Sequence, residues 1–229
     1  MDKVTDEIKQ IGLKHKKIRK IVLFGSRARG DNTPASDYDI AVFCDNTDIS
    51  EEINISNDID NIKTLHKIEL VFIKEKHLDT EFYKNIIKDG VIIMNKFQIK
   101  LNNYTKALAR LHEAIEDAKT INNLTVRDGV IHRFEFTAEL AWKTVREYLI
   151  AEKVTGVNTP KSVMREAFNA GIVSDEEGWI KILDDGNSTS HIYDETDAAE
   201  IYNRICSRHI NLFDDLQKKL SEVDVITET

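Results

Sequence analysis

Short apolar runs separated by polar segments fill the first hundred residues of the chain. The runs Ile21–Phe24 and Ile40–Phe43 are rich in branched and aromatic residues, which is typical of buried strands. Two more strands are expected at 67–73 and 91–94, and apolar residues at helical spacing predict the helices 3–15, 48–65 and 78–88. Because strands alternate with helices, residues 1–97 are predicted to form a small α+β domain.

The pattern changes beyond this domain, where Gly and Pro become scarce and the apolar positions recur at helical spacing. Long helices are expected at 99–121, 126–151 and 197–220. Shorter ones are expected where Thr159-Pro160 opens a helix with Pro at its first position, and from Ser174. The apolar stripe of the second long helix has spacings of three and four, which is typical of a face packed against a core. Residues 98–229 are therefore predicted to form an all-α bundle.

Composition narrows the class of protein. The 229 residues suffice for two modest domains, and 41% hydrophobic with 31% charged residues is typical of a globular protein in solution. No apolar run approaches the roughly 20 residues that cross a bilayer, and the N-terminus lacks the apolar core of a signal peptide. We therefore expect a cytoplasmic protein with no membrane partner.

Charge is unevenly distributed. The net charge is −8, and residues 99–229 hold 16 Lys and Arg against 23 Asp and Glu, which gives −7 for that part alone. A broad nucleic-acid interface normally needs clustered basic residues. RNA is therefore only a weakly supported partner.

The segment between the first two strands holds the most specific chemistry. Gly25-Ser26 allows a sharp turn and a close approach, and backbone N–H groups with a Ser hydroxyl can hold a phosphate. Asp37 and Asp39 are two positions apart, so both carboxylates should leave one face of a strand. Such a pair favours a divalent cation, and carboxylate oxygens suit magnesium. The plainer alternative is an ordinary turn followed by solvated aspartates.

The spacing Gly-Ser-x10-Asp-x-Asp resembles the signature of the DNA polymerase beta-like nucleotidyltransferases, and most of all their minimal nucleotidyltransferase (MNT) branch. The resemblance implies a mixed sheet with helices, ATP as the nucleotide, and two Mg²⁺ ions on Asp37 and Asp39. It also implies a third carboxylate on a later strand, where Glu69 is the match, although the family more often has Asp there. Arg27 and Arg29 either contact phosphates or are solvated surface.

A second polar segment interrupts the helical half at 183–195. From the pattern alone, a helix cap at Gly186-Asn187 followed by a polar connection explains it. Together with residues 134–143, however, this segment resembles the HEPN-type substrate-binding domain that accompanies MNT proteins. That family has Arg-x4-His-x-Tyr, and His191 and Tyr193 match it, whereas Gly186 stands at the Arg position. The missing Arg makes ribonuclease activity doubtful, because nothing there stabilises charge on a phosphoryl transition state.

The combined expectation is a fused MNT–HEPN protein of the toxin–antitoxin type. It would form a homodimer and transfer AMP from ATP to Tyr193 of its own or a neighbouring HEPN domain, with Glu69 taking the proton. One alternative keeps the transferase but gives it a small cationic acceptor, as in the resembling kanamycin nucleotidyltransferase. The other is a HEPN ribonuclease or an inactive interaction module.

Overall fold

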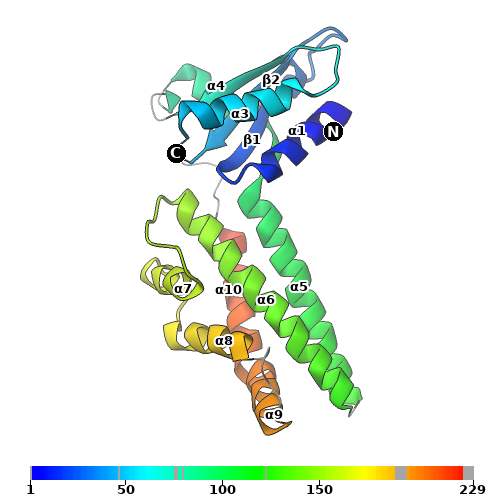
Figure 1. Ribbon diagram of the computed structural model, residues 1–229, viewed down its shortest axis with the longest axis vertical. Helices are drawn as coiled ribbons and strands as arrows, with labels where there is room; N and C mark the ends of the chain where they lie inside the picture. Colours follow the sequence, from blue (N-terminus) through cyan, green and yellow to red (C-terminus); the bar gives the residue numbers. More distant parts are fainter. Residues whose placement is uncertain are drawn as a thin grey trace. The chain divides into compact units, whose positions relative to one another are not determined.

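The chain divides into two compact units, Met1–Lys96 and Phe97–Ile226 (Figure 1). The computed structural model describes residues 2–45, 47–74, 77–78, 80–121, 123–188 and 195–223. In these ranges no helix combines the length and the apolar character that crossing a membrane requires.

Unit 1 is a four-stranded mixed sheet with helices, which confirms the predicted α+β class. Its elements are α1 (Lys3–Lys14), β1 (Ile18–Phe24), α2 (Gly25–Arg29), β2 (Tyr38–Cys44), α3 (Ile49–Asp60), β3 (Ile68–Ile73), α4 (Glu81–Asp89) and β4 (Val91–Asn95). The strand order is β3-β2-β1-β4, with β1 antiparallel to both of its neighbours and β2 parallel to β3. The parallel pair needs a crossover connection, which α3 supplies.

The central strand β1 is covered on both faces. Val22 packs with Ala41 and Ile86, so α4 lies on one face of the sheet. Gly12 of α1 lies so close to Ile21 that an added Cβ would come within 2.5 Å of the Ile21 side chain. Since neighbouring side chains on a strand point to opposite faces, α1 and α4 cover opposite faces of the sheet. This packing fixes the end of β1, where the polar segment begins.

Unit 2 is an all-α bundle, as predicted. It contains α5 (Lys96–Thr120), α6 (Leu124–Ala151), α7 (Pro160–Asn169), α8 (Glu176–Ser188), α9 (Glu195–Arg204), the π-helical segment η3 (Ile205–His209) and α10 (Ile210–Glu222). One continuous core joins these helices, and its largest fully buried side chains are Trp179, Tyr104, Phe134 and Phe213.

Two predictions for unit 2 were wrong in detail. The expected helix 197–220 begins at Glu195 and contains the five-residue π segment η3, in which Ile205 and His209 are both fully buried. The expected cap at Gly186-Asn187 is absent because α8 continues through both residues to Ser188. The preceding residue, Asp185, is bonded on several sides to neighbouring side chains, which supports the helix at this point.

Candidate functional site

The turn at Gly25 brings the end of β1 against an aspartate of β2. Gly25 has φ +69°, and a Cβ placed there would lie 2.1 Å from Oδ2 of Asp39. Only glycine satisfies both the left-handed backbone and this contact. The predicted sharp turn and close approach are present, and the group approached within the chain is the Asp39 carboxylate. Ser26 follows as the second residue of α2 and is half-buried.

The sheet register gathers three carboxylates around this turn. Asp39 is paired with Phe24 on β1 and with Glu69 on β3, and Asp37 lies just before β2. Asp39 is half-buried, whereas Asp37 and Glu69 are exposed. Burial raises the pKa of Asp39, and the negative charges of Glu69 and Asp37 raise it further, while the charge of Arg29 opposes them. The three residues predicted from sequence therefore share one electrostatic neighbourhood.

Asp37 and Asp39 offer oxygens that fit a hard divalent cation such as Mg²⁺. Over the described ranges neither of them forms an ion pair, whereas the Glu69 carboxylate pairs with the ammonium of Lys67. In those ranges no three His, Cys, Asp or Glu side chains are gathered closely enough to hold a metal together. Glu69 would have to leave Lys67 to join the other two carboxylates.

The two arginines of α2 have different surroundings. Arg27 is half-buried, donates to the backbone carbonyls of Ser36 and Asp37, and lies over the ring of Tyr38 at 4.0 Å. Arg29 is exposed and pairs with Asp31 at 3.1 Å. Arg27 is thus committed to the loop before β2, a role that sequence reasoning missed because nothing in the motif indicates which carbonyls face it. A phosphate contact for either arginine stays a prediction.

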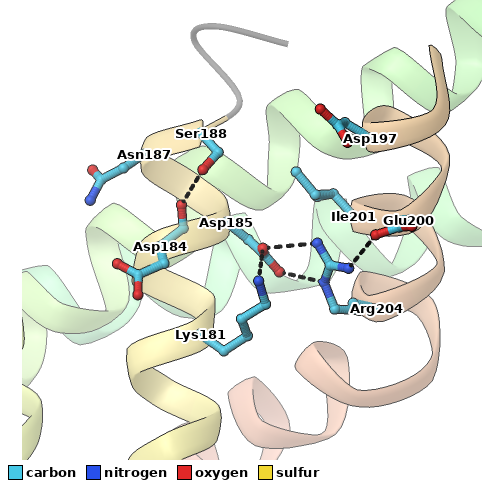
Figure 2. Close-up of a pocket in the computed structure, with 9 residues that line it drawn as sticks. All are labelled: Lys181, Asp184, Asp185, Asn187, Ser188, Asp197, Glu200, Ile201 and Arg204. Carbon is cyan, nitrogen blue, oxygen red and sulfur yellow. Dashed lines mark hydrogen bonds and ion pairs between the residues drawn. The ribbon is translucent and has the colours of Figure 1, made fainter. Parts of the chain in front are cut away.

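Unit 2 contains a pocket of about 610 Å³ between α8 and α9 (Figure 2). Its lining is strongly polar and consists of Lys181, Asp184, Asp185, Asn187, Ser188, Asp197, Glu200, Ile201 and Arg204. Two cations therefore face four carboxylates. The excess of negative charge makes this pocket a poor match for a phosphate group.

Both cations of the lining, Lys181 and Arg204, are bonded to Asp185, as Figure 2 shows. Arg204 donates to it through Nε at 2.9 Å and Nη2 at 3.0 Å, and Lys181 lies 3.0 Å away. The Nε2 atom of the fully buried His209 lies 2.8 Å from Oδ2 of Asp185. Burial by itself would raise the pKa of Asp185, but the hydrogen bonds from His209, Arg204 and Lys181 outweigh burial and hold that pKa far below its usual range.

Sequence reasoning did not find this charged cluster, although one signal was available. His209 lies four residues after Ile205 and four before Phe213, in a stripe that is otherwise apolar. A polar residue in such a stripe indicates a buried partner. Here the partner is Asp185, and the His209 ring also stacks on Phe134 with ring centres 5.5 Å apart.

The motif predicted in unit 2 is only partly within the described residues. Gly186 lies in α8, and a Cβ added there would meet only the Cβ of Ala138, at 4.0 Å. The backbone at this position therefore has room for a Cβ. His191 and Tyr193 lie outside the described residues.

Comparison with known families assigns each unit separately. The model of the family described as "Nucleotidyltransferase substrate binding protein like" matches residues 99–222. The model described as "Polymerase beta, Nucleotidyltransferase" matches residues 6–99. The two matches together cover nearly the whole chain and meet at residue 99.

Individual relatives match part of this chain. A Haemophilus influenzae protein named "Probable ribonuclease HepT" is 33% identical over 85 residues, which are 35% of this chain and 58% of that protein. A Methanocaldococcus jannaschii protein, named provisionally as a protein adenylyltransferase, is 33% identical over 97 residues, or 39% of this chain and 97% of the relative. A solved H. influenzae structure, described as the substrate-binding domain of a nucleotidyltransferase, is 26% identical and covers 53% of this chain and 99% of its own, with a TM-score of 0.49.

Proposed function

We propose that this chain transfers AMP from ATP to a hydroxyl of its own helical unit. The chain belongs to the nucleotidyltransferase substrate-binding protein family through residues 99–222, and it carries a polymerase beta-type nucleotidyltransferase domain at 6–99. The observation that carries the proposal is the contact of Gly25 with Asp39, beside the charges of Asp37 and Glu69. A turn that admits no side chain, placed against a carboxylate cluster, suits a nucleotide phosphate and its cation.

The residues of unit 1 have distinct roles in this reaction. Asp37 and Asp39 would hold Mg²⁺, and the ion, when bound, would supply positive charge to the phosphates. The backbone at Gly25 and the hydroxyl of Ser26 would hold the triphosphate. The acceptor oxygen forms a bond to the α-phosphorus as the bond to the bridging oxygen breaks and pyrophosphate leaves. Glu69, once released from Lys67, would accept the proton of the acceptor hydroxyl.

Tyr193 is the proposed acceptor. The name of the M. jannaschii relative assigns its transfer to proteins, and the Tyr at position 193 matches the family motif. A phenol has a reference pKa of about 10, so the hydroxyl needs a base near neutral pH. The acceptor belongs to the same or a neighbouring chain of a homodimer, in an arrangement of the toxin–antitoxin type.

Ribonuclease activity is not part of this proposal, although the name of the H. influenzae relative mentions it. The motif Arg is replaced by Gly186. Arg204 does not stand in for it, because its Nε and Nη2 atoms are both bonded to Asp185. Lys181 is paired with Asp185 as well. Both cations of the described pocket lining are therefore already bonded to Asp185 and are not available to a phosphate.

A second candidate is transfer to a small hydroxyl-bearing cation. The observation that favours it is the pocket of unit 2, where four carboxylates outnumber two cations. Such a lining would attract an amine-bearing acceptor such as an aminoglycoside. In this case ATP turnover would require the added compound, and the protein itself would gain no mass.

The test is the intact mass of the purified full-length protein before and after incubation with Mg²⁺ and ATP. The double variant Asp37→Ala/Asp39→Ala and the variant Tyr193→Phe are measured in parallel. Added AMP that is lost in both variants supports transfer to Tyr193 by this site. Added AMP that is lost only in the aspartate variant would keep the enzyme but move the acceptor.

Mixing the two variants distinguishes transfer within one chain from transfer between chains. The aspartate variant keeps Tyr193, and the Tyr193→Phe variant keeps the carboxylates. AMP on the aspartate variant after mixing would establish transfer between chains. No adduct in any sample, including the protein as isolated, would refute self-modification and direct the search to small acceptors.

A further inference from the structure

Arg27 holds the backbone on both sides of Asp37. Its Nε donates to the carbonyls of Ser36 and Asp37, each at 3.0 Å, and its Nη2 donates to the Ser36 carbonyl at 2.6 Å. The Ser36 carbonyl belongs to the peptide group before the Asp37 Cα, and the Asp37 carbonyl belongs to the one after it. Each residue has only two soft backbone dihedrals. One planar guanidinium bonded to both peptide groups therefore fixes the direction in which the Asp37 side chain leaves the backbone.

The guanidinium itself rests on a buried support. It lies 4.0 Å from the centre of the Tyr38 ring, and Tyr38 is only 4% exposed. The hydroxyl of Tyr38 donates to Oδ2 of Asp2 at 2.7 Å, and Oδ1 of Asp2 caps α1 by accepting from the Thr5 N–H. Arg27 is thus tied through Tyr38 to the first helix, whereas the loop it holds is largely exposed.

The hydrogen bonds of Arg27 leave little of its guanidinium for a phosphate. Nε and Nη2 both donate to backbone oxygens of the loop. A phosphate would therefore meet chiefly Nη1 rather than the two-nitrogen fork that binds phosphate in a bidentate way.

We infer that Arg27 is a positioning residue that sets Asp37 relative to Asp39 for cation binding, and that it is not a phosphate ligand. The inference rests on the proposed function of this site. It predicts that the fork shape of the guanidinium matters more than its charge, because an ammonium lacks the planar fork that bonds the two peptide groups while its flat face lies over a ring.

The test separates cation binding from nucleotide binding in the full-length protein. Mn²⁺ serves as the probe, with affinity measured by electron paramagnetic resonance without nucleotide, and ATP affinity is measured by equilibrium dialysis in the presence of EDTA. Arg27→Lys keeps the charge but loses the fork, so we expect Mn²⁺ affinity to fall about tenfold or more while ATP affinity changes by less than about twofold. The matched control Arg29→Lys should leave Mn²⁺ affinity within about twofold of wild type.

Three outcomes would contradict the inference. Arg27→Lys could weaken metal-free ATP binding and spare Mn²⁺, which would make Arg27 a phosphate ligand. Both affinities could fall equally, which would indicate general disruption, or neither could change. If Arg27→Lys fails to fold by circular dichroism, Arg27→Gln, which keeps a planar amide with two N–H donors on one nitrogen, is measured by the same pair of assays. Wild-type protein that binds no Mn²⁺ with or without ATP would refute the proposed cation site itself.

Discussion

Asp39 in unit 1 and Asp185 in unit 2 are both at least partly buried, but the side chains around them carry opposite charges. Asp39 faces Asp37 and Glu69, and its pKa is raised by burial and then by those two charges. Asp185 is bonded to an arginine, a lysine and a histidine, and its pKa is lowered despite burial. A carboxylate whose nearest charges are mainly other carboxylates suits a site that binds a cation from solution. A carboxylate surrounded by donors is expected to serve the fold.

The largest expected effect comes from removing the carboxylate charge of Asp185, compared with removing that of Asp39, and measuring stability. Asp185→Asn should lower the free energy of unfolding of unit 2 by roughly 3–5 kcal/mol, because Arg204 and His209 lose their charged partner. Both Trp residues, Trp142 and Trp179, lie in unit 2, so urea unfolding followed by Trp fluorescence reports on that unit. Asp39→Asn relieves repulsion and should leave the free energy of unfolding, measured by circular dichroism, unchanged or slightly higher. Equal losses in the two variants would contradict the comparison.

A second test uses two glycines that share a backbone conformation. Gly25 and Gly30 both have positive φ, but a Cβ at Gly30 meets nothing within 4 Å, whereas one at Gly25 meets Asp39. Gly25→Ala and Gly30→Ala should each cost about 1–2 kcal/mol of stability from the left-handed backbone. Only Gly25→Ala should also abolish Mn²⁺ binding, because the new methyl group displaces the Asp39 carboxylate. Loss of binding in both variants would mean that the whole loop, rather than this contact, determines the site.

The two carboxylates should also respond to pH with opposite signs. The lowered pKa of Asp185 stabilises the fold at pH values above the pKa of an unfolded Asp, about 3.9. This contribution declines as the pH falls below that value. Wild-type unit 2 should therefore lose more stability than Asp185→Asn between about pH 5 and pH 3, as followed by Trp fluorescence in urea. The raised pKa of Asp39 works the other way, so Asp39→Asn should remove a small gain in stability on acidification.

The smallest expected effect concerns Gly186. It lies within α8, and a Cβ there meets only the Ala138 Cβ at 4.0 Å, which is ordinary van der Waals contact. Gly186→Ala should therefore raise the stability of unit 2 by about 0.5–1 kcal/mol, since alanine restricts the unfolded chain and favours helix. Gly171→Ala, at a residue with φ +69°, should lower stability instead. A lower melting temperature for Gly186→Ala would show that the space beside this residue is needed by another group.

Local pattern was enough to predict most of the architecture. The alternation of strands and helices in unit 1, the all-α unit 2 and the turn at Gly25 all follow from residue periodicity and glycine chemistry. The N-cap at Thr159 with Pro160 behind it was equally predictable, and it forms a capping box with Ser162. These features depend on neighbours only a few residues away.

Features that depend on distant partners were missed. Asp185 meets Arg204 and His209 only because α8 packs beside α9 and η3, at separations of 19 and 24 residues. The π segment could not be read from periodicity, because one inserted residue shifts the helical phase without changing composition. The role of Arg27 was missed for a related reason, since it depends on which carbonyls of the Asp37 loop face the guanidinium.

The position of β3 in the sheet suggests that Glu69 and Lys67 also protect a sheet edge. Within the described part of the chain β3 is an edge strand, so one side of its backbone has no strand partner. Such an edge invites pairing with a second molecule, and a charged side chain on the strand, Glu69, and one just before it, Lys67, discourage this. Replacing Glu69 or Lys67 with an apolar residue would thus remove protection against aggregation along with any role in the reaction. The solubility of such variants should be compared before any loss of activity is assigned to chemistry.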